Sequence, residues 1–113
     1  MSYLDYSNQN KKEGITYNNL STGKFKDAGD PEKILTLEER KYFERDLNIL
    51  LNNFISDVAK NRNLNIAKVK SLADGSSILG EQALKDGLID KIGGLHDVTN
   101  YLKAKIGTDV NLC

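Results

Sequence analysis

The chain has 113 residues, with 16 basic and 16 acidic side chains that cancel to a formal net charge of zero. This length corresponds to one domain or part of one. The charge balance gives no support for nucleic acid or an anionic membrane as a partner. No apolar run approaches the ~20 residues that span a bilayer, and polar residues follow Met1 where a signal peptide would be basic and then apolar. We therefore expect neither a transmembrane segment nor a signal peptide in this chain.

The first third of the chain is predicted to contain one strand. Residues 1–13 are polar and are interpreted as a lead-in, either a frayed end or the remnant of an interrupted element. Residues 15–21 carry β-favouring side chains and predict a short strand. Residues 22–35 are predicted to be a loop, because they contain the turn-forming residues Gly23, Gly29 and Pro31.

A long amphipathic helix is predicted to begin at Thr36. Thr36 and Glu39 fit a capping box, in which the hydroxyl and the carboxylate each accept a hydrogen bond from a free amide at the helix start. Apolar residues then follow at helical spacing and predict a core or subunit-interface face. They are Phe43, Leu47, Leu50, Leu51, Phe54, Ile55 and Val58. Residues 61–63 are expected to end the helix.

The last third is predicted to alternate between short helices and short strands. Helices are expected at 66–72, capped by Asn65, at 80–85, stopped by Gly87, and from 95 to 106, closed by Gly107. Residues 77–79 and 88–92 are expected to be strands. This alternation predicts an α/β layer arrangement.

Neither the single cysteine nor the single histidine suggests a cofactor or a metal. Cys113 is the last residue, and we interpret it as an exposed thiol. His96 falls in the first turn of a predicted helix without a second histidine or a cysteine nearby, so a surface or capping role is expected. The sequence predicts neither a metal site nor a cofactor.

One lysine, Lys26, stands in a short glycine-bounded segment between the first predicted strand and the long helix. A lysine acts as a base only where its surroundings hold it neutral near pH 7, and the start of a packed helix after a tight turn can provide such surroundings. Because side chains alternate along extended backbone, Phe25 is expected to direct Lys24 and Lys26 to opposite sides.

Five motifs occur in a fixed order along the chain. They are Gly-Lys-Phe-Lys-Asp-Ala-Gly-Asp-Pro (23–31), Thr-Leu-Glu-Glu-Arg (36–40), Leu-Ala-Asp-Gly (72–75), Gly-Glu-Gln-Ala-Leu (80–84) and Gly-Leu-Ile-Asp-Lys-Ile-Gly-Gly-Leu (87–95). From about Gly14 to about Ile106, this ordered set resembles the signal peptide peptidase A, or protease IV, family of serine peptidases. It matches only the C-terminal part of that family's catalytic domain.

The resemblance implies a Ser/Lys dyad and the C-terminal portion of a crotonase/Clp-like α/β fold over residues 14–107, followed by a tail at 108–113. Lys26 takes the position of the general base, with Gly23, Lys24, Asp27 and Gly29 as the supporting motif. The family degrades cleaved signal peptides or similar membrane-released peptides. Peptide substrates and a membrane-associated parent protein are therefore expected.

The serine position of the family has no match in this chain. Upstream of the lysine motif there are only Ser2 and Ser7, and neither lies in a Gly-x-Ser-like setting. The chain alone is therefore expected to be inactive, and the serine-bearing remainder of the domain, or a neighbouring protomer, is the expected partner. Ser76 and Ile78 depart from the arginine and the aromatic residue usual in the family, whereas Arg62 matches its arginine after the long helix.

Two other interpretations remain open. In one, the chain is a catalytically inactive assembly module that uses the long amphipathic helix to pack against other copies, as a homo-oligomer. In the other, it is a relative of the Clp-type or crotonase-type proteins, because these carry a segment like residues 80–90, and Lys26 is then incidental.

Overall fold

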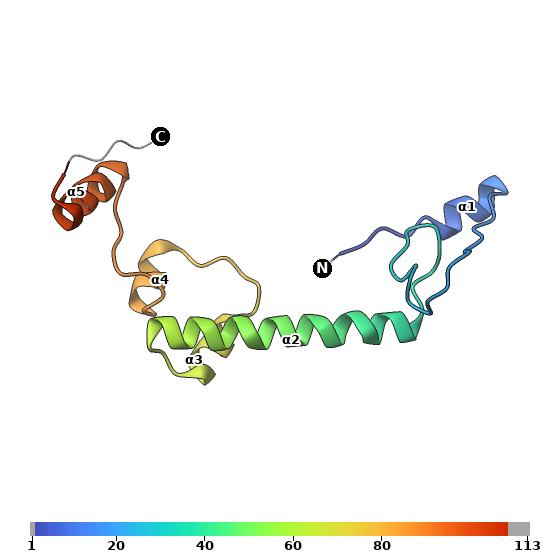
Figure 1. Ribbon diagram of the computed structural model, residues 1–113, viewed down its shortest axis with the longest axis horizontal. Helices are drawn as coiled ribbons and strands as arrows, with labels where there is room; N and C mark the ends of the chain where they lie inside the picture. The colour runs from blue at the N-terminus through green and yellow to red at the C-terminus, as the bar shows by residue number, and fades with distance from the viewer. Residues whose placement is uncertain (1, 109–113) are drawn as a thin grey trace. The chain divides into compact units, whose positions relative to one another are not determined.

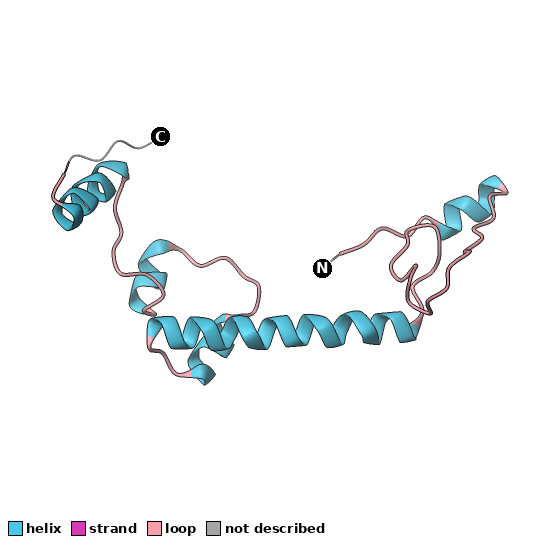
Figure 2. Ribbon diagram, viewed as in Figure 1, coloured by secondary structure: helices cyan, strands magenta, loops and turns pink. Residues whose placement is uncertain are grey.

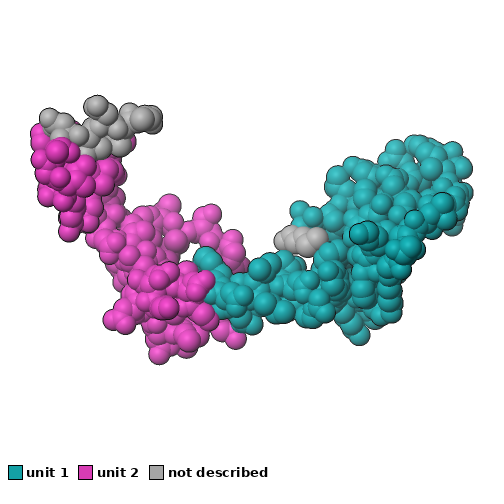
Figure 3. All heavy atoms as spheres, viewed as in Figure 1, with its two compact units in different colours: residues 1–54 teal, residues 55–113 magenta. Residues whose placement is uncertain are grey.

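The computed structural model describes residues 2–108, and five helices lie in that part of the chain (Figure 1). They are α1 (Ser7–Glu13), α2 (Leu37–Arg62), α3 (Ile66–Leu72), α4 (Gly80–Lys85) and α5 (Leu95–Ile106). The chain divides into two compact units, Met1–Phe54 and Ile55–Cys113 (Figure 3). The predicted helices at 66–72, 80–85 and 95–106 are confirmed with these boundaries.

The predicted α/β fold is wrong for this chain. Within residues 2–108 every regular element is a helix, and the three predicted strands at 15–21, 77–79 and 88–92 are loops, bends or turns (Figure 2). A strand is stabilised by backbone hydrogen bonds to a neighbouring strand. None of these segments hydrogen bonds to another through its backbone in the described part. Their β-favouring side chains are therefore not sufficient to make a sheet.

Helix α1 lies inside the polar lead-in, where no element was assigned from the sequence. The Asp5 carboxylate accepts hydrogen bonds from the Ser7 backbone N–H (2.9 Å) and from the Ser7 hydroxyl (2.5 Å). The helix ends at Gly14, whose φ of 74° is left-handed. The Tyr6 N–H donates to the Pro31 carbonyl at 2.7 Å, which ties the residues before α1 to the loop that follows the lysine motif.

Helix α2 begins with the predicted capping box. The Thr36 hydroxyl accepts from the Glu39 N–H at 3.2 Å, and the Glu39 carboxylate accepts from the Thr36 N–H at 2.8 Å and from the Thr36 hydroxyl at 2.9 Å. This reciprocal arrangement satisfies amides that the helix itself leaves free. The helix ends before Asn63, which has a positive φ of 51°. The capping prediction is confirmed, as is the predicted end of the helix.

The apolar side chains in the middle of α2 are exposed. Leu50 is 64% exposed and Phe54 is 59% exposed, while Leu47 and Leu51 are each about two-fifths exposed. The two ends of the predicted apolar face are covered, where Phe43 is partly buried and Ile55 is buried. Burial of these large exposed side chains against another apolar surface would be favourable.

The core of the second unit is small. Ile55 and Ala59 of α2 pack with Val69 of α3, and three partly buried residues surround them, namely Val58, Leu64 and Ala73. Helix α3 is positioned by the predicted cap, because the Asn65 side chain accepts from the Ala67 N–H at 2.8 Å.

The later helices of this unit end at left-handed glycines. Gly87, with φ of 79°, follows α4, and a Cβ there would lie 3.3 Å from a methyl group of Leu64. Gly107, with φ of 76°, closes α5. At the start of α5 the Asp97 carboxylate accepts from the Gly94 N–H at 2.8 Å. These positions confirm the predicted helix stops, which depend on the absence of a Cβ.

Candidate active site

The lysine motif forms a series of tight turns from Gly23 to Asp30. The Lys26 N–H donates to the Gly23 carbonyl at 3.0 Å, and the Asp30 N–H donates to the Asp27 carbonyl at 3.1 Å. Because the backbone turns here, the expected alternation of side chains along an extended segment does not apply. The turn, and not an extended backbone, therefore determines where the Lys26 side chain points.

Gly29 is required by both the conformation and the space of this turn. Its φ of 80° is left-handed, and a Cβ placed on it would lie 3.1 Å from Cζ of Phe43 on α2. A larger residue at Gly29 would strain the left-handed backbone, and its Cβ would lie too close to the Phe43 ring. The sequence identified Gly29 as part of the motif, and the structure supplies a physical reason for a glycine at this position.

Aromatic rings hold the turn against the first turns of α2. The Phe25 and Tyr42 rings are stacked, with centroids 5.0 Å apart and an interplanar angle of 9°. The Phe43 ring lies 5.4 Å from that of Tyr42 at a tilt of 60°. Offset and tilted ring pairs of this kind add to the stabilisation from burial alone. The residue next to Lys26 is thereby fixed to the helix.

Three lysines lie in or next to the motif, and two of them form ion pairs. Lys24 forms an ion pair with Glu38 and lies over the Phe25 ring, with Nζ 5.5 Å from the centroid. Lys33 pairs with two carboxylates, as described below. Lys26 is exposed, and its ammonium makes no hydrogen bond or ion pair to any residue from 2 to 108. It is the amine of the motif that is free within the described chain.

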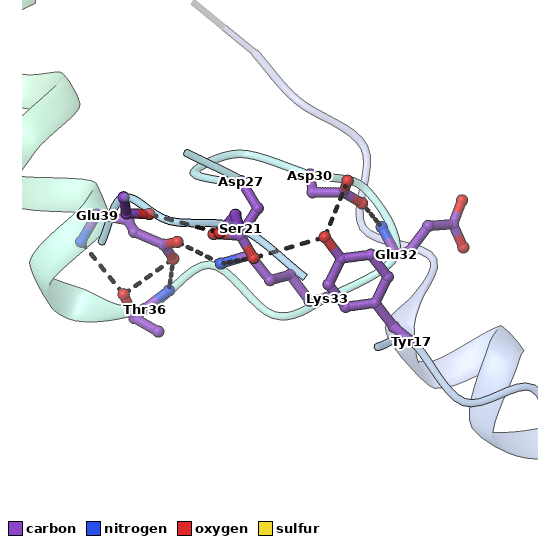
Figure 4. A network of polar contacts seen from close by, with 9 residues as sticks. Tyr17, Ser21, Asp27, Asp30, Glu32, Lys33, Thr36 and Glu39 are labelled. Atoms are coloured by element: carbon purple, nitrogen blue, oxygen red, sulfur yellow. Dashed lines mark hydrogen bonds and ion pairs between the residues drawn. The ribbon is translucent and has the colours of Figure 1, made fainter. Parts of the chain in front are cut away.

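Lys33 bridges the motif and the start of α2 (Figure 4). Its Nζ lies 3.2 Å from Oδ2 of Asp27 and also donates to the Glu39 carboxylate. The hydrogen bond from Lys33, opposed by burial, holds the pKa of the Glu39 carboxyl below its usual value. The same bond, with a smaller contribution from Asp27, raises the pKa of the Lys33 ammonium. Both shifts favour the charged forms.

Tyr17 extends this network to the residues before the motif. Its hydroxyl lies 3.3 Å from Oδ2 of Asp30 and 3.5 Å from Oδ2 of Asp27. Burial raises the pKa of the Tyr17 phenol, and the two carboxylates raise it further. The Asp30 carboxylate also accepts from the Glu32 N–H at 2.9 Å. The neighbouring Glu32 accepts in turn from the Asn10 side chain of α1.

None of the serine hydroxyls in residues 2–108 hydrogen bonds to Lys26. The Ser21 hydroxyl donates to the Gly23 carbonyl at 3.5 Å, and the Ser7 hydroxyl donates to Asp5. Ser76, an expected departure from the family that the sequence resembles, donates both its hydroxyl and its N–H to the Asp74 carboxylate. Within the described chain, Lys26 therefore has no serine hydroxyl at hydrogen-bonding distance.

A shallow hollow of about 360 Å³ lies beside the motif in the same unit. It is lined by Ser2, Tyr3, Leu4, Tyr6, Gly29 and Pro31. In residues 2–108, no group of three or more metal-ligating side chains comes together. His96 is exposed in the first turn of α5, and Cys113 lies outside the described residues.

Arg62 has a defined role in the second unit. Its guanidinium donates to both carboxylate oxygens of Asp90, at 3.0 and 2.8 Å, and its Nε–H donates to the Gly87 carbonyl at 2.8 Å. This two-point geometry suits arginine and cannot be reproduced by lysine. Arg62, the last residue of α2, therefore holds the Gly-Leu-Ile-Asp motif at residues 87–90.

Comparison with known proteins identifies the family. The family model for "Peptidase family S49" matches residues 1–109. The chain belongs to Peptidase family S49. The Clp-type and crotonase-type interpretation is thereby set aside.

Three curated relatives of this S49 chain match over most of its length. "Putative protease MJ0651" of Methanocaldococcus jannaschii is 35% identical over 103 residues, which is 91% of this chain and 33% of that protein. "Putative signal peptide peptidase SppA" of Enterococcus faecium is 36% identical over 91% of this chain and 30% of its own length. "Serine protease SPPA, chloroplastic" of Arabidopsis thaliana is 29% identical over 89% of this chain and 15% of its own length. The S49 chain thus spans about a third or less of these relatives.

None of the helices in residues 2–108 is both long enough and apolar enough to cross a bilayer. The longest, α2, carries many charged side chains along its 26 residues.

Proposed function

We propose that this chain is the lysine-bearing part of a Ser/Lys dyad endopeptidase in which Lys26 is the general base. One observation supports the assignment above the others. Of the three lysines around the motif, Lys24 and Lys33 are held in ion pairs, and only Lys26 is without a partner within residues 2–108. An amine that is held as an ammonium in a salt bridge cannot accept a proton.

In the proposed reaction the neutral Lys26 amine takes the proton of a serine hydroxyl as the serine oxygen attacks a peptide carbonyl. The resulting ammonium then gives a proton to the leaving amine, so the lysine ends as it began. In water a lysine is more than ~99.9% protonated at pH 7. The base therefore needs a desolvated setting, which the exposed surface around Lys26 in this chain does not provide. The covering groups are proposed to come from outside residues 1–113.

The serine is proposed to come from the remainder of the S49 domain or from a neighbouring protomer. The length of the relatives supports this, because this chain matches only about a third of the Enterococcus and Methanocaldococcus proteins. The name of the Enterococcus relative supports cleaved signal peptides or membrane-released peptides as substrates, and with them a membrane-associated parent protein.

A chimera tests this proposal. Residues 1–109 replace the matching segment of the Enterococcus faecium relative, and casein cleavage is measured for the chimera, its Lys26→Ala variant and a Lys41→Ala control. Lys41 is exposed on α2 and makes no ion pair in residues 2–108. We expect Lys26→Ala to lower the rate at least ~10²-fold, the lower end of the usual contribution of a general base. Retention of activity in a folded Lys26→Ala chimera would remove Lys26 from the mechanism.

A second candidate function is favoured by the exposed face of α2. If the chain is a catalytically inactive assembly module, Leu50 and Phe54 would be covered by other copies. Each of the two candidates makes its own measurable demand. The module requires stable self-association of the isolated chain, and the peptidase requires the Lys26 amine in the chimera.

A further inference from the structure

The first unit is held together by polar contacts more than by an apolar core. Among residues 2–54, the two buried side chains are Asn10 and Glu39, and both are polar. Each makes a contact between separate segments, Asn10 with Glu32 and Glu39 with Lys33. Loss of one of these contacts therefore leaves the ring contacts of Phe25, Tyr42 and Phe43 as the remaining support of the turn.

Of Lys24, Lys26 and Lys33, Lys33 has the least exposed side chain. Its side chain is 22% exposed, and its partners Asp27 and Glu39 are 14% and 5% exposed. By contrast, the Lys24 side chain, paired with Glu38, is 65% exposed. Poorly hydrated ion pairs are much less screened than exposed ones, and removal of one partner leaves a charge without hydration or a counter-ion.

The position of Asp27 connects Lys33 with Lys26. Asp27 follows Lys26 directly, and its carbonyl accepts the hydrogen bond that closes the next turn at Asp30. Its Oδ2 is already engaged by Lys33 and by the Tyr17 hydroxyl. Within residues 2–108, Asp27 forms its ion pair with Lys33 and not with the neighbouring Lys26 ammonium.

We propose that Lys33 is a positioning residue for Lys26. Its ammonium clamps Asp27 to Glu39, fixes the turn that carries Lys26 on α2, and keeps the adjacent carboxylate from pairing with the proposed base. Without Lys33, Asp27 becomes a counter-ion beside Lys26 and favours its protonated form. This inference rests on the proposed function only for the role of Lys26; the clamp itself is a property of the isolated chain.

The clamp is tested first in the isolated full chain by amide hydrogen exchange. Lys33→Met removes the charge at similar side-chain volume, and Lys33→Arg retains it. We expect Lys33→Met to accelerate exchange of the Lys26 and Asp30 amides about tenfold or more, because it lowers the local opening free energy. Lys33→Arg and the control Lys41→Met should leave both amides close to the wild-type rate. Equal exchange in wild type and Lys33→Met would overturn the clamp.

Positioning is separated from simple structural support by the pH profile of the chimera. We expect Lys33→Met to shift the rising limb of the kcat–pH profile to higher pH, with a small change in KM. In Lys33→Arg the rising limb should lie at the wild-type pH. Faster exchange together with an unmoved limb would show that Lys33 only supports the fold, and would overturn the positioning role. If Lys26→Ala leaves the chimera active, the proposed function fails, while the exchange rates still decide whether Lys33 clamps the turn.

Discussion

The Lys33 ammonium lies 3.2 Å from Oδ2 of Asp27 and at the same time hydrogen bonds Glu39, so one cation joins the lysine motif to the first turn of α2. Together with the Phe25–Tyr42 ring stack, this contact places Lys26 on a turn with two independent attachments to the helix. A side chain proposed to accept a proton within a narrow geometry benefits from such support, because small displacements of a catalytic group are costly.

The charge network predicts a stability that falls at both ends of the pH scale. The pKa of Glu39 is lowered in the folded chain, so its contribution is present above the ordinary carboxyl pKa and is lost as the pH falls through the folded value. The pKa of Lys33 is raised, so its contribution is complete below the ordinary lysine pKa and is lost as the pH rises through the folded value. Denaturant unfolding from about pH 3 to about pH 11 should show a plateau between these limits.

Lys33→Met provides the control for this profile. It removes the cation whose hydrogen bond with Glu39 causes the largest part of both pKa shifts. The acid-side loss of stability should therefore be smaller in the variant than in the wild-type chain, and the alkaline loss should lose the part caused by Lys33 and keep the part caused by the raised pKa of the Tyr17 phenol. An unchanged profile in Lys33→Met would show that other groups determine the pH dependence.

Gly29→Ala is expected to destabilise the first unit more than Gly14→Ala. Both glycines have left-handed φ angles, 80° and 74°, so both substitutions carry a backbone cost of about 1 kcal/mol. Only at Gly29 would the new Cβ also meet a ring atom, Cζ of Phe43, at 3.1 Å, whereas nothing lies within 4 Å at Gly14. The free energy of unfolding should differ between the two variants by a further ~1 kcal/mol. Equal losses would mean that Phe43 moves aside without cost.

Thr36→Ala tests the capping box that begins α2. The Thr36 hydroxyl accepts from the Glu39 N–H and donates to its carboxylate, and loss of such a cap costs about 1 kcal/mol. Helix content by circular dichroism and the free energy of unfolding should both fall. Thr22→Ala, in the exposed loop before the motif, serves as the matched control and should change neither quantity measurably.

The local signals in the sequence predicted most of the helices. Thr36 with Glu39, and Asn65, act through hydrogen bonds to amides two or three residues away, and Gly87 and Gly107 act through their own φ. Such signals depend only on near neighbours, so they can be recognised without a structure. Helix α1 was missed because its sequence, SNQNKKE, contains no apolar residue and therefore no periodicity.

Features that depend on distant partners could not be predicted in the same way. Residues 15–21 and 88–92 have the side chains of strands, but a strand needs a paired backbone, and none is present in residues 2–108. Lys33 meets Asp27 and Glu39 because the loop folds back on α2, and a separation of six residues in each direction matches no helical or strand repeat. Family resemblance identified Lys26, but only the structure distinguishes it from its paired neighbours.

The exposed face of α2 predicts self-association of the isolated chain. Leu50 and Phe54 are more than half exposed on successive turns of the helix, and covering apolar surface is favourable by roughly 25 cal/mol per Å². Sedimentation equilibrium should therefore show oligomers of the wild-type chain and a shift toward monomer in a Leu50→Glu, Phe54→Glu variant. Asn48→Glu and Asn52→Glu, also exposed on α2, lower the net charge by the same two units without removing apolar surface. If both double variants dissociate alike, charge repulsion and not this face controls assembly, and the assembly-module interpretation loses its support.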